Sequence, residues 1–235
     1  MDESRNERPR EVAAPAEASQ GASEAADSYL QRLRENRTSK SENTDGGDEE
    51  SEQPQHREIK EGGEPLSEFP ELERQVREAV ERAREGVERW GPEDQQHART
   101  WLGSSSGEVR DRLRTVLERM DGDIDRVQLV PFEDDMTPEE QANTFAYVYP
   151  GDEQRRIHVG ALFRDASETP PDSRAGIIVH EMSHFRDIGG TRDVQAAYGE
   201  DGSRQLAAAH PEVAQHTADN FEYFVEEYSR SGGPR

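Results

Sequence analysis

The stretch HEMSHFRDIGGTRD, residues 180–193, decides the fold and the chemistry expected of this chain. His180 and His184 are four residues apart, so on a helix their imidazoles project from one face about one turn apart. Two such nitrogens suit a Zn²⁺ ion, and Glu181 lies beside that face, where it can act as a general base on a metal-bound water. A catalytic zinc ion usually has three protein ligands. The stretch therefore predicts a zinc centre whose third ligand comes from elsewhere.

The third ligand distinguishes between classes of zinc site. The metzincin pattern requires glycine three residues and histidine six residues after the second motif histidine. This chain has Asp187 and Gly190 at those positions, so the metzincin pattern is excluded. A glutamate from a later helix, Glu222 or Glu226, is one candidate ligand. Asp193 is the other, because a turn at the two preceding glycines lets the chain fold back beneath the helix.

Outside this stretch, the apolar spacing predicts an α+β domain. Amphipathic helices are expected at residues 71–90 and 107–120, joined by a glycine- and serine-rich turn. Short runs of β-branched and aromatic residues between 126 and 163 predict a small sheet, with a hairpin turn at 149–155. Asp172 or Ser173 is expected to cap the helix that carries the motif, and the glycines at 189 and 190 to end it. Two further helices are expected at 203–210 and 211–230.

Composition separates an arm from this domain. Hydrophobic residues are 30% of the 235-residue chain, charged residues 34%, and the formal net charge is -23. Residues 1–65 have few large apolar side chains and predict a disordered acidic arm or pro-segment, whereas residues 66–235 predict the folded domain. The acidic balance argues against nucleic-acid binding, and no apolar run is long enough to cross a membrane. We expect a monomer.

The first residues, MDESRNERPREV, have no apolar core, so they predict no Sec signal peptide. The chain has no cysteine, which fits a reducing compartment but does not exclude export. Localisation therefore stays open between the cytoplasm and export by a route other than Sec.

The motif and its surroundings resemble the deuterolysin, or aspzincin, family of zinc endopeptidases, and in particular its peptidyl-Lys members. The family signature is HExxH, then GTxD, then Tyr-Gly. The resemblance covers residues 125–228 and includes the stretches TFAYVYP, IHVGALF, DSRAGIIVHEMSHF, AYG and ADNFEYF. It implies a zincin-like metallopeptidase domain with a small sheet, an active-site helix and flanking helices.

Residue by residue, the resemblance implies zinc ligands at His180, His184 and Asp193. It implies Glu181 as the base and Tyr198 as the hydrogen-bond donor to the transition-state oxyanion. The chain departs from the family here, because the four residues VQAA separate Asp193 from Tyr198 where the family usually has two. A later acidic pair of the lysine-specific members, which lines the pocket for the residue after the scissile bond, matches the residues Asp219 and Glu222.

The predicted function is hydrolysis of peptide bonds in a protein or peptide substrate by a water activated on one Zn²⁺ ion, with lysine or another basic residue after the scissile bond. The alternative is a catalytically silent zincin-like domain that binds a protein partner, although the presence of Glu181 argues against it. Lys40 and Lys60 are the only lysines, and both lie in the predicted arm. One explanation for the absence of lysine from the domain is the Arg-for-Lys bias of a GC-rich genome. The other is resistance of the domain to self-digestion, with Lys40 and Lys60 as self-processing sites.

Overall fold

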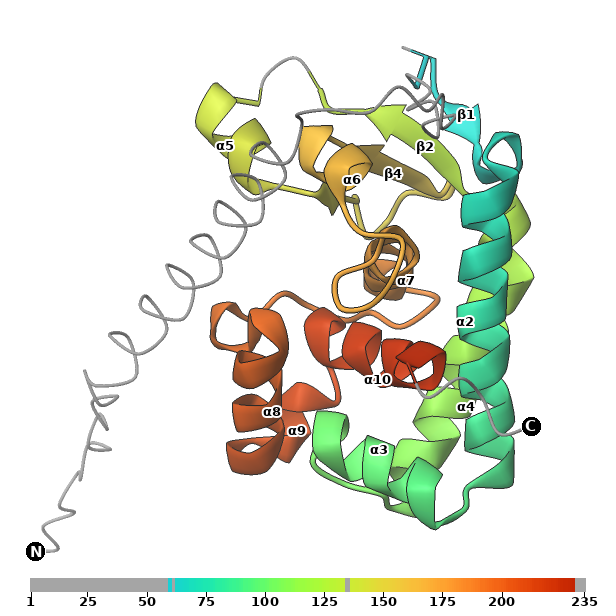
Figure 1. Cartoon of the computed structure of the whole chain (residues 1–235), viewed down its shortest axis with the longest axis vertical. Helices are drawn as coiled ribbons and strands as arrows, with labels where there is room; N and C mark the ends of the chain where they lie inside the picture. The colour runs from blue at the N-terminus through green and yellow to red at the C-terminus, as the bar shows by residue number, and fades with distance from the viewer. Residues whose placement is uncertain (1–58, 61, 134–135, 231–235) are drawn as a thin grey trace, which may run out of the picture.

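The computed structural model describes residues 59–60, 62–133 and 136–230 (Figure 1). The fold combines helices with a small mixed sheet, which confirms the predicted α+β class. Most of the predicted arm lies outside the described residues, while Glu64 and Pro65, the last two residues before the predicted boundary, form the first strand. Within the described ranges, no helix combines the length and apolar character needed to cross a membrane.

The elements alternate along the chain in short units. The helices are α2 (Pro70–Arg89), α3 (Pro92–Leu102), α4 (Gly107–Asp123), α5 (Pro138–Asn143), α6 (Ala161–Asp165), α7 (Arg174–His184), α8 (Gly199–Ala209), α9 (Pro211–Ala214) and α10 (Ala218–Arg230). The strands are β1 (Glu64–Pro65), β2 (Gln128–Pro131), β3 (Ala146–Tyr147) and β4 (Arg156–Val159). Short 3₁₀ turns are η1 (Leu66–Glu68), η2 (Ile124–Arg126) and η3 (Gln195–Ala197).

The sheet has the order β1-β2-β4-β3. The central strands β2 and β4 are parallel, with Leu129 opposite Ile157, and both side chains are fully buried. The outer strands β1 and β3 run antiparallel to their neighbours. The predicted hairpin turn joins β3 to β4, where the Asp152 amide donates to the Tyr149 carbonyl at 2.8 Å. As a result, β1 and β3 are the two edges of the sheet.

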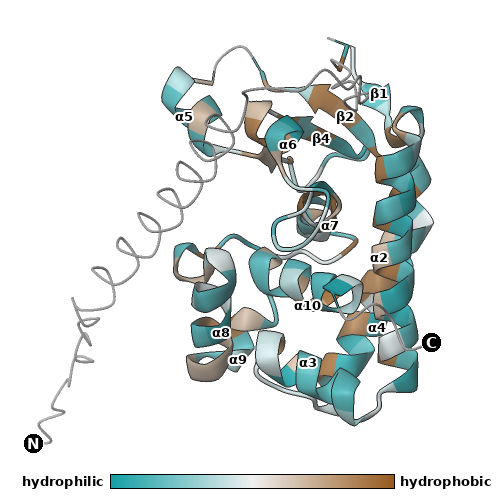
Figure 2. Cartoon of the chain, in the orientation of Figure 1, coloured by the Kyte–Doolittle hydropathy of each residue, from teal (hydrophilic) through white to brown (hydrophobic). Residues whose placement is uncertain are grey.

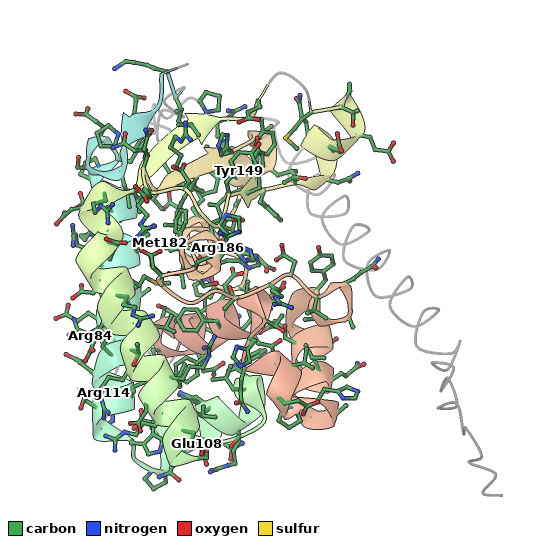
Figure 3. All side chains as sticks on the ribbon, turned by 180° about the vertical axis from the view of Figure 1, so that it is seen from behind. Arg84, Glu108, Arg114, Tyr149, Met182 and Arg186 are labelled. Carbon is green, nitrogen blue, oxygen red and sulfur yellow. The ribbon has the colours of Figure 1, made fainter. Side chains whose placement is uncertain are left out.

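Helix α7 lies at the centre of the fold, between the sheet and α10, with α2 and α4 along one side (Figure 1). It is apolar around most of its circumference, as expected for a buried helix, and Ile178, Val179 and Met182 have no exposed surface. Figure 2 shows hydrophobic colour on β2 and α7 and in patches on α2 and α4. From behind, Met182 lies at the middle of the molecule, whereas Arg84 and Arg114 lie along α2 and α4 (Figure 3).

One helix was missed, and two expectations about helix boundaries were wrong. The first expected helix ends at Arg89 as α2, but α3 lies between the two amphipathic helices that were expected; Pro92 occupies its first turn, and the Asp94 carboxylate accepts from the Gly91 amide at 2.8 Å. Helix α7 ends at His184 and not at the two glycines. The single helix expected at 211–230 is divided into two helices, α9 and α10. The break occurs because the segment between them pairs with the chain beside Asp193.

Candidate metal centre

Ser173 begins the helix that carries the motif. Its hydroxyl oxygen accepts from the Gly176 amide at 2.9 Å, as an N-cap does. The same hydroxyl donates to the Glu226 carboxylate of α10 at 2.6 Å. Gly176 permits this approach, because a Cβ atom there would lie 2.2 Å from Glu226 Oε1 and 2.8 Å from Glu222 Oε1. The start of α7 is therefore packed directly against the carboxylates of α10.

The end of α7 reverses the chain beneath the helix. The amides of Gly189 and Gly190 both donate to the Phe185 carbonyl, at 3.1 and 3.0 Å. Gly190 has φ +58°, in the left-handed region that favours glycine. A Cβ atom on Gly189 would lie 2.5 Å from the Ser183 carbonyl oxygen. The two glycines thus form the tight return predicted from the sequence, although they lie beyond the helix end.

The returning segment then pairs with the start of α10. The Arg192 amide donates to the His216 carbonyl at 2.9 Å, and the Ala218 amide donates to the Arg192 carbonyl at 3.1 Å. These two bonds fix the backbone on the N-terminal side of Asp193. Asp193 therefore meets the histidines from below α7.

Arg112 of α4 binds both the glycine turn after α7 and the segment before α10. Its Nε donates to the Gln215 carbonyl and its Nη2 to the Gly189 carbonyl, each at 3.0 Å. Hydrogen bonds from a charged donor are stronger than neutral ones. One guanidinium thus joins the glycine turn to the segment that precedes α10.

His180, His184 and Asp193 bring three metal-binding atoms together. Asp193 Oδ1 lies 3.1 Å from His180 Nε2 and 3.3 Å from His184 Nε2. In a tetrahedral zinc site with ligand distances near 2.0–2.1 Å, neighbouring ligand atoms are about 3.3 Å apart. Every pair of these ligand atoms lies within 4.8 Å. The three side chains therefore fit one Zn²⁺ ion.

The other nitrogen of each histidine has its own partner. His180 Nδ1 lies 3.1 Å from Glu222 Oε2, and His184 Nδ1 lies 3.1 Å from the Thr191 carbonyl oxygen. Carboxylates and backbone carbonyls at this position orient the ring of a metal ligand and fix its tautomer. The donor set thus leaves both Nε2 atoms for the metal. It also places Glu222 beside a ligand instead of in the ligand set.

Glu181 is buried next to these ligands, with 5% of its surface exposed. Its Oε2 has no hydrogen-bond partner among the described residues, which is rare for a buried carboxylate. Burial raises the pKa of Glu181, while the neighbouring His180 and His184 oppose that rise. A carboxylate with a free oxygen and a raised pKa suits a group that accepts a proton from a water at the metal.

Asp193 and the histidines favour each other's charged forms. Burial raises the pKa of Asp193, but hydrogen bonds from His180 and His184 outweigh burial and hold it well below its usual range. Burial lowers the pKa of His180, yet its hydrogen bonds to Asp193 and Glu222 raise it well above the usual value. Without a metal the histidines therefore retain protons, which a Zn²⁺ ion must displace.

A cavity of about 470 Å³ opens beside these residues. Its wall includes His180, Glu181 and Asp193 on one side and the edge strand β3 with Phe145 on another. Tyr198 also lines it, with 36% of its surface exposed, so the longer step from Asp193 to Tyr198 still brings this side chain to the cavity. The cavity is therefore open both to the metal ligands and to an edge of the sheet.

Part of the cavity wall is acidic. Asp219, Glu222 and Asp172 all line it. Asp219 Oδ2 and Glu222 Oε1 are buried and have no hydrogen-bond partner among the described residues. Burial raises the pKa of Asp219 to about 6 and that of Glu222 well above its usual value. Asp172 accepts from the Tyr223 hydroxyl at 2.6 Å. The wall thus offers carboxylate oxygens that a cationic group would satisfy.

The structure brings every predicted site residue to one place, although Glu222 touches both the histidine and the cavity. Sequence reasoning missed Thr191, Arg112 and Asp172. The threonine belongs to the quoted stretch, so its carbonyl could have been considered there. Arg112 lies on a distant helix, and no local pattern distinguishes it from the other arginines of α4.

The family model for lysine-specific metallo-endopeptidases matches residues 90–226, more than half of the chain. The chain belongs to this family, which confirms the resemblance to the aspzincins. The match includes α7, the turn to Asp193 and α10 as far as Glu226, so it covers every predicted site residue.

Individual relatives agree over shorter stretches. An extracellular protease of Aeromonas hydrophila is 48% identical over 82 residues, covering 35% of this chain and 23% of the relative. A peptidyl-Lys metalloendopeptidase of Grifola frondosa is 39% identical over 127 residues, covering 54% of this chain and 34% of the relative. The matches thus span about a quarter to a third of these curated relatives.

A solved structure, titled a zinc peptidase from Grifola frondosa, superimposes with a TM-score of 0.55 and 31% sequence identity. The superposition covers 68% of this chain and 95% of that chain. The helix-rich fold with a small mixed sheet is therefore that of the family.

Proposed function

We propose that this protein is a zinc-dependent endopeptidase that cleaves on the amino side of lysine. The observation that carries the proposal is that two features lie side by side at one site. His180, His184 and Asp193 present three ligand atoms with the spacing of a tetrahedral site. The unpartnered Glu181 carboxylate lies buried beside them.

Zn²⁺ bound by these three residues would lower the pKa of a coordinated water and polarise the substrate carbonyl. Glu181 then takes a proton from the attacking water and passes it to the leaving amine nitrogen. Tyr198, at the cavity edge, donates its hydroxyl proton in a hydrogen bond to the oxygen that becomes negative. Water is the nucleophile, so no covalent enzyme intermediate is required.

The substrate backbone is expected to extend along β3. This strand is an edge of the sheet, and its residues Ala146 and Tyr147 line the cavity. An extended peptide can add to such an edge through main-chain hydrogen bonds, which bind it without regard to most of its side chains. That arrangement suits an endopeptidase, whose specificity then depends on one pocket.

Asp219 and Glu222 account for the preference for lysine. Two buried carboxylate oxygens without partners are costly, and an ammonium group with its three donors can satisfy them. The family and two of the relatives are also named for their action on lysine. We therefore assign these two side chains to the pocket for the residue after the scissile bond.

Digestion of casein tests the activity. Zinc-loaded wild type should release peptides, and a chelator should stop the release. Glu181→Gln should bind zinc with little change but release peptides at least about 100-fold more slowly, since the base is lost. Release of no peptides by the zinc-loaded wild type would instead favour a silent domain that binds a protein partner.

A further inference from the structure

Lys60 is the only lysine among the described residues, and its surroundings suggest a use. Its side chain is 72% exposed. It lies four residues before Glu64, the first residue of β1. From residue 61 to residue 235 the sequence contains no lysine, although arginine is frequent. A protease with the proposed preference therefore finds one exposed substrate residue at the junction of arm and domain.

Within the described ranges, Lys60 makes its polar contacts with Gly63 and Glu64, which are close to it in sequence. Its Nζ pairs with Glu64 Oε1 at 2.8 Å, its amide lies 3.4 Å from Glu64 Oε2, and its carbonyl accepts from the Gly63 amide at 2.8 Å. Strand β1 itself is two residues long. Segments with few buried contacts and exposed hydrogen bonds open locally at low free-energy cost. The Ile59–Lys60 bond can thus become extended without unfolding the helices.

We infer that a second copy of this protein cleaves the Ile59–Lys60 bond and so separates residues 1–59 from the domain. This inference rests on the proposed function. Water adds its oxygen to the Ile59 carbonyl carbon, the C–N bond breaks, and the products are the Ile59 carboxylate and the Lys60 ammonium. No other reactant is needed.

Cleavage occurs between molecules because of the sheet order. Strand β1 is one edge and β3, which lines the cavity, is the other. With three strand spacings between them, the two edges are roughly 14 Å apart. Figure 1 shows β1 at the end of the sheet away from α5. To reach its own cavity, Lys60 would have to cross the sheet, whereas the cavity of a second molecule meets no such obstacle.

The structure also provides a place for the new terminus. Glu64 is buried, with 2% of its surface exposed, and its Oε2 already lies 3.4 Å from the backbone nitrogen of Lys60. Cleavage turns that amide nitrogen into an ammonium within ion-pair reach of the carboxylate. The cleaved domain therefore begins with a charge pair that the intact chain lacks.

The test mixes unlabelled active protein with ¹⁵N-labelled full-length Glu181→Gln as substrate, and a short lysine peptide serves as an internal standard. Intact mass and N-terminal sequencing should show labelled protein that begins at Lys60, with an initial rate proportional to the concentration of active enzyme. Lys60→Gln in the labelled protein should abolish this product, and Lys40→Gln should leave it unchanged.

Three results would overturn the inference. If the standard peptide is cut while labelled Ile59–Lys60 stays intact, processing is refuted and the proposed activity survives. If unlabelled protein is cut but labelled protein is not, cleavage by a second copy is refuted. If neither standard nor protein is cut, the proposed function fails as well.

The new terminus has its own readout. Glu64→Gln should lower the melting temperature of the cleaved domain by more than it lowers that of the full-length chain, because only the cleaved form carries the α-ammonium of Lys60 in addition to its side-chain ammonium. The comparison is made in the Glu181→Gln background, with cleaved protein prepared by adding active enzyme and removing it. Equal shifts in both forms would refute the proposed ion pair.

Discussion

Replacing Asp193 by asparagine tests the third metal ligand. The substitution keeps the shape of the side chain but removes a negative charge from an oxygen that lies 3.1 and 3.3 Å from two imidazole nitrogens. Loss of a residue that hydrogen-bonds to a metal ligand, without touching the metal, typically weakens metal binding about 10- to 100-fold. For a charged ligand we therefore expect a loss of more than about 100-fold in zinc affinity, or about 2.8 kcal/mol.

Competition with a fluorescent chelator measures that loss directly. Asp187→Asn is the matched control, because Asp187 belongs to the same loop but pairs with Arg155 and is 66% exposed. The zinc affinity of Asp187→Asn should equal that of the wild type. In metal-free protein, histidine titrations followed by NMR should show a lower pKa for His180 in Asp193→Asn, because the hydrogen bond that raises this pKa loses its negatively charged acceptor.

The reasoning would be refuted if Asp193→Asn bound zinc within about threefold of the wild type. Combined with complete loss of zinc in Glu226→Gln, that result would place the third ligand on α10. The contacts make this outcome unexpected, because Glu226 accepts hydrogen bonds from the Ser173 hydroxyl and amide at the start of α7.

Three other changes have defined outcomes. Glu222→Gln should weaken zinc binding about 10- to 100-fold in the chelator competition, since it weakens the carboxylate contact to His180 Nδ1, whereas Glu226→Gln should not. Arg112→Met should weaken zinc binding and lower the free energy of unfolding, measured in urea, by about 2 kcal/mol, because the Gln215 and Gly189 carbonyls lose their donor. Arg114→Met is the control and should change neither quantity, because Arg114 forms a surface ion pair with Glu88. Zinc affinity measured against pH should fall roughly tenfold per unit for each proton displaced below the raised pKa of His180, and an affinity independent of pH from 5 to 8 would contradict the proton competition.

The centre of the fold followed from local sequence signals. The cap at Ser173 was one of two predicted positions, and the apolar residues around α7 indicate a buried helix. The short β-branched runs lie where β2, β3 and β4 form. These features depend on neighbours in the sequence, so a single chain reveals them.

Helix boundaries were harder because tertiary contacts decide them. No glycine or proline lies between α9 and α10, and the break arises where Thr217 bridges to Arg192. Likewise, α7 ends at His184, and the Thr191 amide returns to donate to the Ser183 carbonyl. In both places the backbone bonds to a segment outside the helix, and that pairing replaces a continuing helix.

In the candidate site, too, some features follow from local sequence and others depend on tertiary contacts. The spacing of His180, Glu181 and His184 predicted two ligands and a base from helix geometry alone. The choice of Asp193 as third ligand needed the family resemblance, because spacing left Glu222 and Glu226 open. The structure accounts for that choice through the two bonds that fix Arg192 against the start of α10. Arg112, which supports this pairing, follows only from the packing of α4.

A cleavage profile on a proteome-derived peptide library tests the central claim most directly. Zinc-loaded wild type should produce new N-termini that begin predominantly with lysine, and Glu181→Gln should produce almost none. Asp219→Asn should keep cleaving but with a weaker preference for lysine, since one of the two pocket carboxylates is lost. New termini without any enrichment of lysine would contradict the assignment of the pocket, and an unchanged library would contradict the proposed activity itself.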